Sequence, residues 1–224
     1  MVESRVPSVS GRESLAAASP AQALGHRRLA IDVRPLVLAG LGLATVMATD
    51  LIDFGADHLR VQLLDASSDA SWSHRVVSAL LVGVTAVSVI GLWRSRAHRA
   101  VWAATAAMLG LLAIDEVSSL HAHIDQMTWG KALYAPILVV LGVCVLRLAN
   151  GADQRVVLVA GLAALVVSFA LHVFGLHVVH ALGWGTNSWA YQVKVGLKEG
   201  TELAGALLVL VALWRVAVAR GPSA

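Results

Sequence analysis

The sequence predicts an all-α membrane protein, a polytopic bundle of six transmembrane helices, and three observations support this fold class. The 224 residues are 58% hydrophobic and only 14% charged, with a mean hydropathy of +0.74. A soluble domain usually carries about 25% charged residues. Several apolar runs reach the roughly 20 residues that a helix needs to cross a bilayer. Lys and Arg gather in alternate connecting segments, as they do in multi-pass proteins.

The six expected spans share long apolar character, and most carry polar residues at one end. They cover about 36–57, 76–93, 100–123, 132–149, 156–182 and 190–214. Together they form one membrane domain, 35–218, and a short cytoplasmic tail, 219–224, follows it. Residues 1–34 are polar and basic, without an apolar segment long enough for a signal peptide. We expect this first segment to be a partly disordered tail.

The distribution of basic residues predicts the orientation. Of the 17 Lys and Arg residues, twelve fall in the two tails and in the second and fourth connections. Cytoplasmic segments carry this excess, so both termini are expected inside a cell (plasma) membrane. The arginines of the first tail would meet anionic lipid headgroups there. The seven tryptophans all fall at expected span ends, where interfacial aromatic side chains are common.

Composition also limits the partners and the chemistry. The single cysteine, Cys144, lies in an apolar run, so neither an internal disulfide nor a thiolate cluster can form. The lipid bilayer is the expected partner and nucleic acid is not, while a homo-oligomer stays open. Gly196, Gly200 and Ala204 repeat every four residues, which would let the last helix pack closely against a neighbour.

Ionisable residues concentrate in the outer half of four expected spans. At 1.5 Å per residue, a deep group lies roughly 12–15 Å below the interface: Asp50, Asp115, Glu116, His172, Lys198, Glu199 and Glu202. A second group lies nearer the surface: Asp57, His58, His121, His123, His177, His180 and Lys194. Asp50, Asp53 and Asp57 share one helix face. We expect a cavity open to the outside, with walls from the spans at 36–57, 100–123, 156–182 and 190–214. His74 and His98 are expected in loops, away from it.

The deep group has more acids than bases. Its acids are Asp50, Asp115, Glu116, Glu199 and Glu202, and its ammonium is Lys198, expected to pair with Glu202 one turn on. An uncompensated charge at membrane depth costs at least a few kcal/mol. The acids must therefore be protonated, hydrated in a water-filled cavity, or bound to a cation.

Imidazole and carboxylate without thiolate favour zinc, iron or manganese. The expected ligands of such a divalent metal are Glu116, His121, His172, Glu199 and Glu202, with Asp115 and Glu116 as catalytic groups. Supporting side chains or a proton path would come from Asp50, Asp53, His123, His177, His180 and Lys198. The chain has no HExxH sequence, and its Glu-x-x-Glu pair is common by chance.

Two short segments carry a family resemblance. DEVSSLH at 115–121 and KEGTELAG at 198–205 resemble uncharacterised bacterial multi-pass membrane proteins with a DExxxxH helix and an ExxE helix. A fainter similarity is to intramembrane zinc hydrolases of the alkaline ceramidase type, which use Ser, Asp and three His. That resemblance implies Ser118 or Ser119, Asp115, His172, His177 and His180 as candidates. The chain departs from that family in its histidine spacing and in having six expected spans rather than seven.

Three functions from different classes remain. The first is a metal-dependent hydrolase of a lipid or other amphiphile, in which the metal activates a water molecule. The second is a proton- or cation-coupled transporter, since intramembrane acids serve that function equally well. The third is a haem-binding or accessory membrane subunit whose histidines ligate axially.

Overall fold

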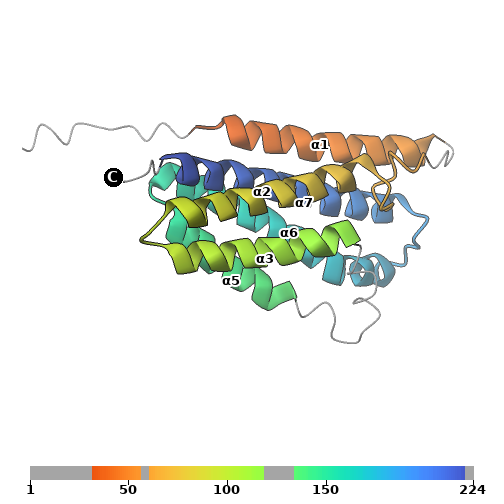
Figure 1. Cartoon of the computed structure of the whole chain (residues 1–224). Helices are drawn as coiled ribbons and strands as arrows, with labels where there is room; N and C mark the ends of the chain where they lie inside the picture. The colour runs from red at the N-terminus through yellow and green to blue at the C-terminus, as the bar shows by residue number, and fades with distance from the viewer. Residues whose placement is uncertain (1–31, 57–60, 119–133, 220–224) are drawn as a thin grey trace, which may run out of the picture. The chain divides into compact units, whose positions relative to one another are not determined.

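The structure is a computed structural model, and it describes residues 32–56, 61–118 and 134–219. The regular elements in these ranges are all helices, which confirms the all-α class. In chain order they are α1 (Arg34–Gly55), α2 (Trp72–Arg94), α3 (Arg99–Ser118), α5 (Tyr134–Leu148), α6 (Ala152–Ala181) and α7 (Trp189–Ala219) (Figure 1).

Five of these helices are long and apolar enough to cross a membrane, namely α1, α2, α3, α6 and α7. The other, α5, is also apolar, and its 15 described residues begin at Tyr134, directly after the undescribed residues 119–133. The chain is therefore a membrane protein by the length and composition of its helices.

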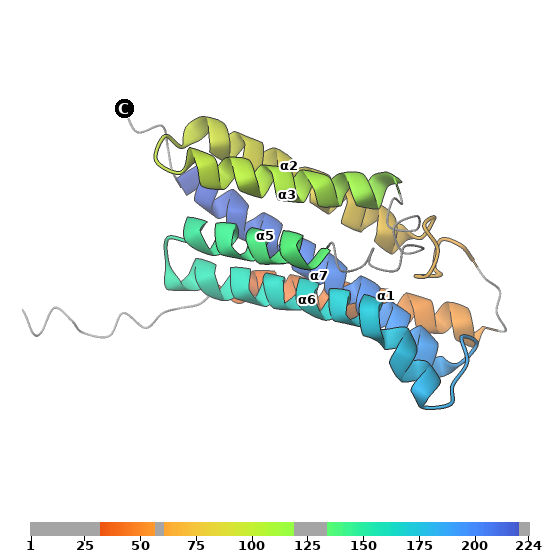
Figure 2. The same cartoon turned by 90° about the horizontal axis from the view of Figure 1, so that it is seen from below.

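Helix α7 is the centre of the bundle. It packs against α1, α2, α5 and α6. In its most apolar stretch of 18 residues, 61% of the residues are buried, against 22–33% in the corresponding stretches of the other four long helices. Figures 1 and 2 show α7 running through the bundle, with α1, α2 and α6 alongside it. In its last turns Leu213 and Val216 are fully buried. Most side chains in this apolar part of α7 are therefore enclosed by neighbouring helices.

The contact between α1 and α7 depends on glycines, as the small-residue repeat predicts. A Cβ at Gly200 would lie 2.4 Å from Cδ1 of Leu43, and one at Gly42 would lie 2.6 Å from Cδ2 of Leu203. A Cβ at Gly196 would lie 3.3 Å from Oδ2 of Asp50. The two helices approach so closely that no larger residue fits without a shift.

Trp102 lies in the first turn of α3, at the span end expected for it, but its side chain faces the protein core. Its side chain is fully buried between α3 and α2, where a Cβ at Gly91 would come within 2.6 Å of the indole ring. The missing side chain of Gly91 creates the space that the ring fills. Trp102 is therefore a core residue that joins these two helices.

Helix α2 begins four residues before the expected limit of 76–93. Ser71 caps it, because its hydroxyl oxygen accepts a hydrogen bond from the backbone N–H of His74. The expectation that His74 lies in a loop is thus wrong. The end of the expected span 100–123 lies partly outside the described residues, as do His121 and His123.

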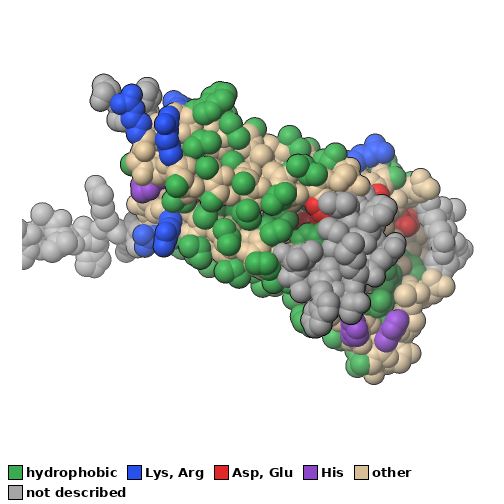
Figure 3. Space-filling model, turned by 60° about the horizontal axis from the view of Figure 1, so that its bottom comes forward, with side chains coloured by type: hydrophobic (Ala, Val, Ile, Leu, Met, Phe, Trp, Pro, Cys, Tyr) green, Lys and Arg blue, Asp and Glu red, His purple; other side chains and the backbone are tan. Residues whose placement is uncertain are grey.

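The charged side chains are separated along the bundle. Figure 3 shows Lys and Arg mainly at one end and acidic side chains near the other. Arg94, Arg96 and Arg99 belong to the α2–α3 connection at the basic end. The amino ends of α2 and α7 and the carboxyl end of α3 form the acidic end, where the cavity described next lies.

Candidate functional site

A cavity of about 100 Å³ lies between α2, α3, α5, α6 and α7. One water molecule needs roughly 10–15 Å³ of such cavity volume, so the cavity has room for several waters or one small solute. Its lining is partly ionisable and partly apolar: Leu81, Leu112, Asp115, Glu116, Tyr134, Leu138, Leu165, Ser168, Phe169, His172, Lys198 and Glu202.

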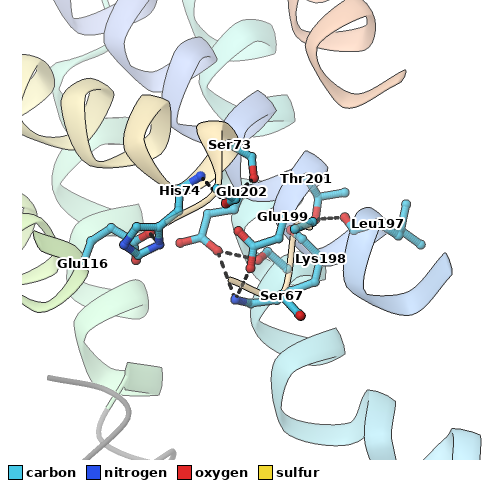
Figure 4. Close-up of polar contacts among 12 residues, drawn as sticks. Ser67, Ser73, His74, Glu116, Leu197, Lys198, Glu199, Thr201 and Glu202 are labelled. Atoms are coloured by element: carbon cyan, nitrogen blue, oxygen red, sulfur yellow. Dashed lines mark hydrogen bonds and ion pairs between the residues drawn. The ribbon is translucent and has the colours of Figure 1, made fainter. Parts of the chain in front are cut away.

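His74 and Glu116 form a pair at one side of the cavity. Nδ1 of His74 lies 2.8 Å from Oε1 of Glu116, and only 14% and 11% of the two side chains are exposed (Figure 4). His74 lies in the first turn of α2 and Glu116 near the end of α3, so the pair connects the two helices. A protonated imidazole would donate a charge-assisted hydrogen bond here.

Lys198 lies between two carboxylates of its own helix. Its Nζ is 2.7 Å from Oε1 of Glu199 and 3.8 Å from Oε2 of Glu202 (Figure 4). The expected pairing with Glu202 is present, but the shorter contact is to Glu199. The Ser168 hydroxyl, from α6, donates to Oε2 of Glu202 at 3.2 Å. One ammonium is therefore shared by two acids, and a hydroxyl from a second helix fixes one of them.

Asp115 is held from the opposite direction, by α5. The Tyr134 hydroxyl donates to Oδ2 of Asp115 at 2.9 Å, and the Tyr134 ring lies 6.4 Å from that of Phe169 on α6. His172, one turn beyond Phe169 on α6, also lines the cavity. Side chains from α3, α5 and α6 thus meet around the same space as Lys198.

The two buried aspartates of α1 have a different role. Oδ1 of Asp50 accepts a hydrogen bond from the backbone N–H of Ala66 at 3.1 Å, and Oδ1 of Asp53 accepts one from Val61 at 2.9 Å. Trp72 donates its indole N–H to Thr49, also on α1. These bonds hold the connection 61–71 against α1, and that connection leads directly into Ser71 and His74.

A family model described as "Domain of unknown function (DUF8692)" matches residues 24–216, which contain every residue that lines the cavity. The chain belongs to the DUF8692 family. No curated protein and no solved structure matches this DUF8692 chain. The family match gives no link to the alkaline ceramidase-type hydrolases.

The DUF8692 structure brings most of the predicted deep group to the cavity. Asp115, Glu116, His172, Lys198 and Glu202 line it, and Glu199 contacts Lys198 beside it. The expected wall from the first span is wrong, because α1 contributes no lining residue and its two aspartates bind the connection 61–71 instead.

Other predicted residues lie away from the cavity or outside the described ranges. His177 and His180 are exposed on α6 and are not among the described residues that line it. Ser118 is exposed, and its hydroxyl donates to the backbone oxygen of Ile114. The predictions for His121 and His123, and for Ser119, fall outside the described residues.

The described ranges of the DUF8692 chain contain no group of three or more His, Cys, Asp or Glu side chains close enough to hold a metal ion. The reason lies in how the carboxylates are used. Glu116 faces His74, Asp115 accepts from Tyr134, and Glu202 contacts Ser168 and Lys198. His121 was among the expected ligands and lies outside the described residues.

Three polar residues of the site were not predicted from the sequence, namely His74, Tyr134 and Ser168. A hydropathy window places the start of a span at its first apolar residue, which excluded His74. The helix-capping pattern of Ser71 three residues before it was the signal that extends the helix. Tyr134 and Ser168 are single polar groups in apolar helices, which carry no distinctive pattern by themselves.

Proposed function

We propose that this DUF8692 protein is a multi-pass membrane carrier that exchanges protons for a cation at the cavity between α2, α3, α5, α6 and α7. One observation supports this most directly: Asp115, Glu116 and Glu202 line a single cavity of about 100 Å³ together with one lysine and one histidine. Ionisable residues at membrane depth mark ion and proton pathways more often than they serve structure.

The balance of charge favours an exchangeable positive species. With Glu199 beside the cavity, the described residues place four carboxylates at or next to it and one ammonium, that of Lys198, which contacts two of them. His74 and His172 add positive charge only when they are protonated. Full ionisation of the acids would therefore leave surplus negative charge in a low-dielectric region, and protons or a bound cation remove that surplus.

Exchange follows from competition at the same oxygens. A cation binds well when the nearby carboxyl groups have lost their protons to water, and protonation of those groups weakens its binding. Asp115 and Glu202 suit this function, because each is held by a neutral hydroxyl donor, from Tyr134 and Ser168 respectively. A neutral hydroxyl can accept as well as donate, so it serves both protonation states of its carboxyl partner.

The proposal includes a topology. All six helices would span the plasma membrane, with both termini cytoplasmic. The arginines of the α2–α3 and α5–α6 connections support this orientation, as does the basic segment 1–34 that would face anionic lipids. Lys198 would then lie about 13 Å from the outer end of α7, within a site that opens outward.

A flux assay tests the carrier. The full chain is reconstituted in liposomes with a trapped pH dye, and an outward or inward cation gradient is imposed. Wild-type protein should move protons against the cation, Glu202→Gln should lower the initial rate at least tenfold, and Asp153→Asn, at the far end of α6, should leave it unchanged. Equal rates for wild type and Glu202→Gln would contradict the proposal.

The metal-dependent hydrolase remains as a second candidate, because Glu116, His172 and Glu202, three of its predicted ligands, line the same cavity. His121 would have to complete the ligand set. Elemental analysis of protein never exposed to a chelator decides between the two, with stoichiometric zinc, iron or manganese expected for the hydrolase. Protein without any of these metals, and without hydrolysis of amphiphilic esters or amides, would eliminate this candidate.

A further inference from the structure

The cavity lining combines two kinds of surface that a single class of ligand satisfies. Its carboxylates are Asp115, Glu116 and Glu202. The remainder is dominated by apolar and aromatic side chains: Leu81, Leu112, Tyr134, Leu138, Leu165 and Phe169. An inorganic ion gains nothing from leucine and phenylalanine surfaces, whereas a ligand that has both a charge and a hydrocarbon body contacts both kinds.

We propose that the cation carried at this site is a small organic ammonium ion, such as an alkylamine or a methylated ammonium. This inference rests on the proposed carrier function and names its substrate class. The Tyr134 and Phe169 rings lie 6.4 Å apart with an angle of 48° between their planes, beside the carboxylate of Asp115. Aromatic faces next to an acid are the usual recognition elements for ammonium ligands.

The position of the Tyr134 ring is fixed by a polar contact. Its hydroxyl donates to Asp115 at 2.9 Å, so ring and carboxylate move together and present a charge partner and a π-system to one ligand. The site already holds one ammonium, that of Lys198, which lies 2.7 Å from Glu199 and 3.8 Å from Glu202. The acids of α7 are therefore arranged at distances that suit a –NH₃⁺ group.

A bare metal or alkali ion fits this lining less well. Such ions need several oxygen ligands at roughly 2.0–2.6 Å to replace their water shell. In the described residues each lining carboxylate already contacts a protein donor, and no group of three acids or histidines is close enough to surround an ion. An ammonium ion needs only one or two acceptors at hydrogen-bond distance, and its methyl or ethyl groups contact the leucines.

The cavity volume suits a small ligand. About 100 Å³ is several times the space that one water requires, which is enough for a few non-hydrogen atoms. Tetramethylammonium and ethylammonium are the probes of matching size. The neutral tert-butanol has nearly the shape of the first probe without its charge.

Calorimetry on the purified full chain in lipid nanodiscs tests the inference. Tetramethylammonium or ethylammonium should bind at least tenfold more tightly than K⁺, Na⁺ or Mg²⁺, and tert-butanol should not compete. Phe169→Leu keeps an apolar side chain of somewhat smaller volume and removes a ring, so it should weaken ammonium binding roughly fivefold or more. Phe174→Leu is the matched control on α6, since Phe174 is 62% exposed and does not line the cavity.

Specific results would overturn the inference. These are equal affinity for K⁺ and the organic cations, equal affinity for tert-butanol and tetramethylammonium, or equal effects of Phe169→Leu and Phe174→Leu. The comparison of charged and neutral probes uses wild-type protein, so it decides even if a variant does not fold. If inorganic cations drive proton flux and organic ammonium ions do not bind, the inferred substrate class is wrong and the proposed carrier function still holds. Ammonium binding without any flux would remove the carrier function instead.

Discussion

His74 Nδ1 and Glu116 Oε1 lie 2.8 Å apart, and this contact connects the first turn of α2 to the end of α3 beside the cavity. Ser71 fixes the backbone of His74 by capping the helix, and the connection before Ser71 is bound to α1. The position of the imidazole therefore depends on groups in two other parts of the chain. Glu116 in turn depends on the imidazole, because its side chain is only 11% exposed.

Replacement of His74 by alanine should destabilise the protein by about 1–3 kcal/mol, since it leaves a buried carboxylate without this partner. His98→Ala is the control, because His98 is exposed at the α2–α3 connection. Thermal unfolding in detergent measures both. A double variant, His74→Ala with Glu116→Gln, should recover part of the loss, since the amide carries no charge to compensate. Equal melting temperatures for His74→Ala and His98→Ala would contradict this account.

Replacement of Lys198 by methionine should cost about 3–5 kcal/mol, the usual range for removing one partner of a buried ion pair. Methionine keeps the apolar stem, so the lost group is the ammonium between Glu199 and Glu202. Lys194→Met is the comparison on the same helix, where Nζ lies 5.6 Å from the Tyr191 ring centroid, and its effect should be smaller. Denaturation midpoints of the two variants check the order, and the proposal for this cluster is wrong if the order is reversed.

The helical class and most of the deep polar group were predictable because both depend on local composition. Apolar runs predict where the helices lie, and a charged residue within such a run is recognisable whichever way the helix faces. The cavity residues Asp115, Glu116, Lys198 and Glu202 were therefore predicted. The close contact of Gly200 with α1 was predictable for the same reason, from a four-residue repeat. The end of α5 at Leu148 also follows composition, one residue before the expected limit, and its expected start at 132 lies outside the described residues.

The partners of these residues were not predictable in the same way. Asp50 belongs by depth with the other acids, but its oxygen accepts from Ala66, 16 residues later, and nothing in either residue type indicates that pairing. Likewise Trp102 looks interfacial by position and is buried because Gly91, on a different helix, leaves space for it. Such contacts depend on the rotation of each helix about its axis, which hydropathy does not determine in a helix that is apolar on all sides.

Asp50 should tolerate asparagine better than alanine. Asparagine keeps an acceptor for the Ala66 N–H, whereas alanine leaves that N–H buried and unpaired, at a cost of about 1–3 kcal/mol. The connection 61–71 should then exchange its amide hydrogens faster in Asp50→Ala than in Asp50→Asn. Hydrogen-exchange mass spectrometry of this connection measures the difference. Similar exchange in the two variants would show that Asp50 does not hold the connection.

Gly200→Ala should separate α1 from α7. The added Cβ would lie 2.4 Å from Leu43 Cδ1 and 3.2 Å from its Cα, and the backbone atom cannot move without the helix. A loss of about 1–3 kcal/mol is typical of overpacking. Gly40→Ala is the matched control on α1, because no atom lies within 4 Å of that Cβ, and it should be neutral or slightly stabilising. Melting temperatures that fall equally in both variants would contradict the close packing.

The ion pair between Asp32 and Arg215 should make the stability of the folded protein depend on pH in the acidic range. Arg215 Nη2 lies 2.6 Å from Asp32 Oδ2 and joins the start of α1 to the last turns of α7. The pKa of Asp32 is lowered, first by the hydrogen bond from the Arg34 N–H and then by that from Arg215. A carboxyl group whose folded pKa is depressed adds stability above its unfolded pKa of about 4 and loses it as pH falls through the folded pKa.

Asp32→Asn should therefore melt below wild type at pH 7 and low salt. The difference should be small, because both side chains of the pair are well exposed. The melting temperatures of the two proteins should converge near pH 3 or in 1 M NaCl. A gap that persists unchanged at low pH and high salt would show that the variant acts through something other than this charge.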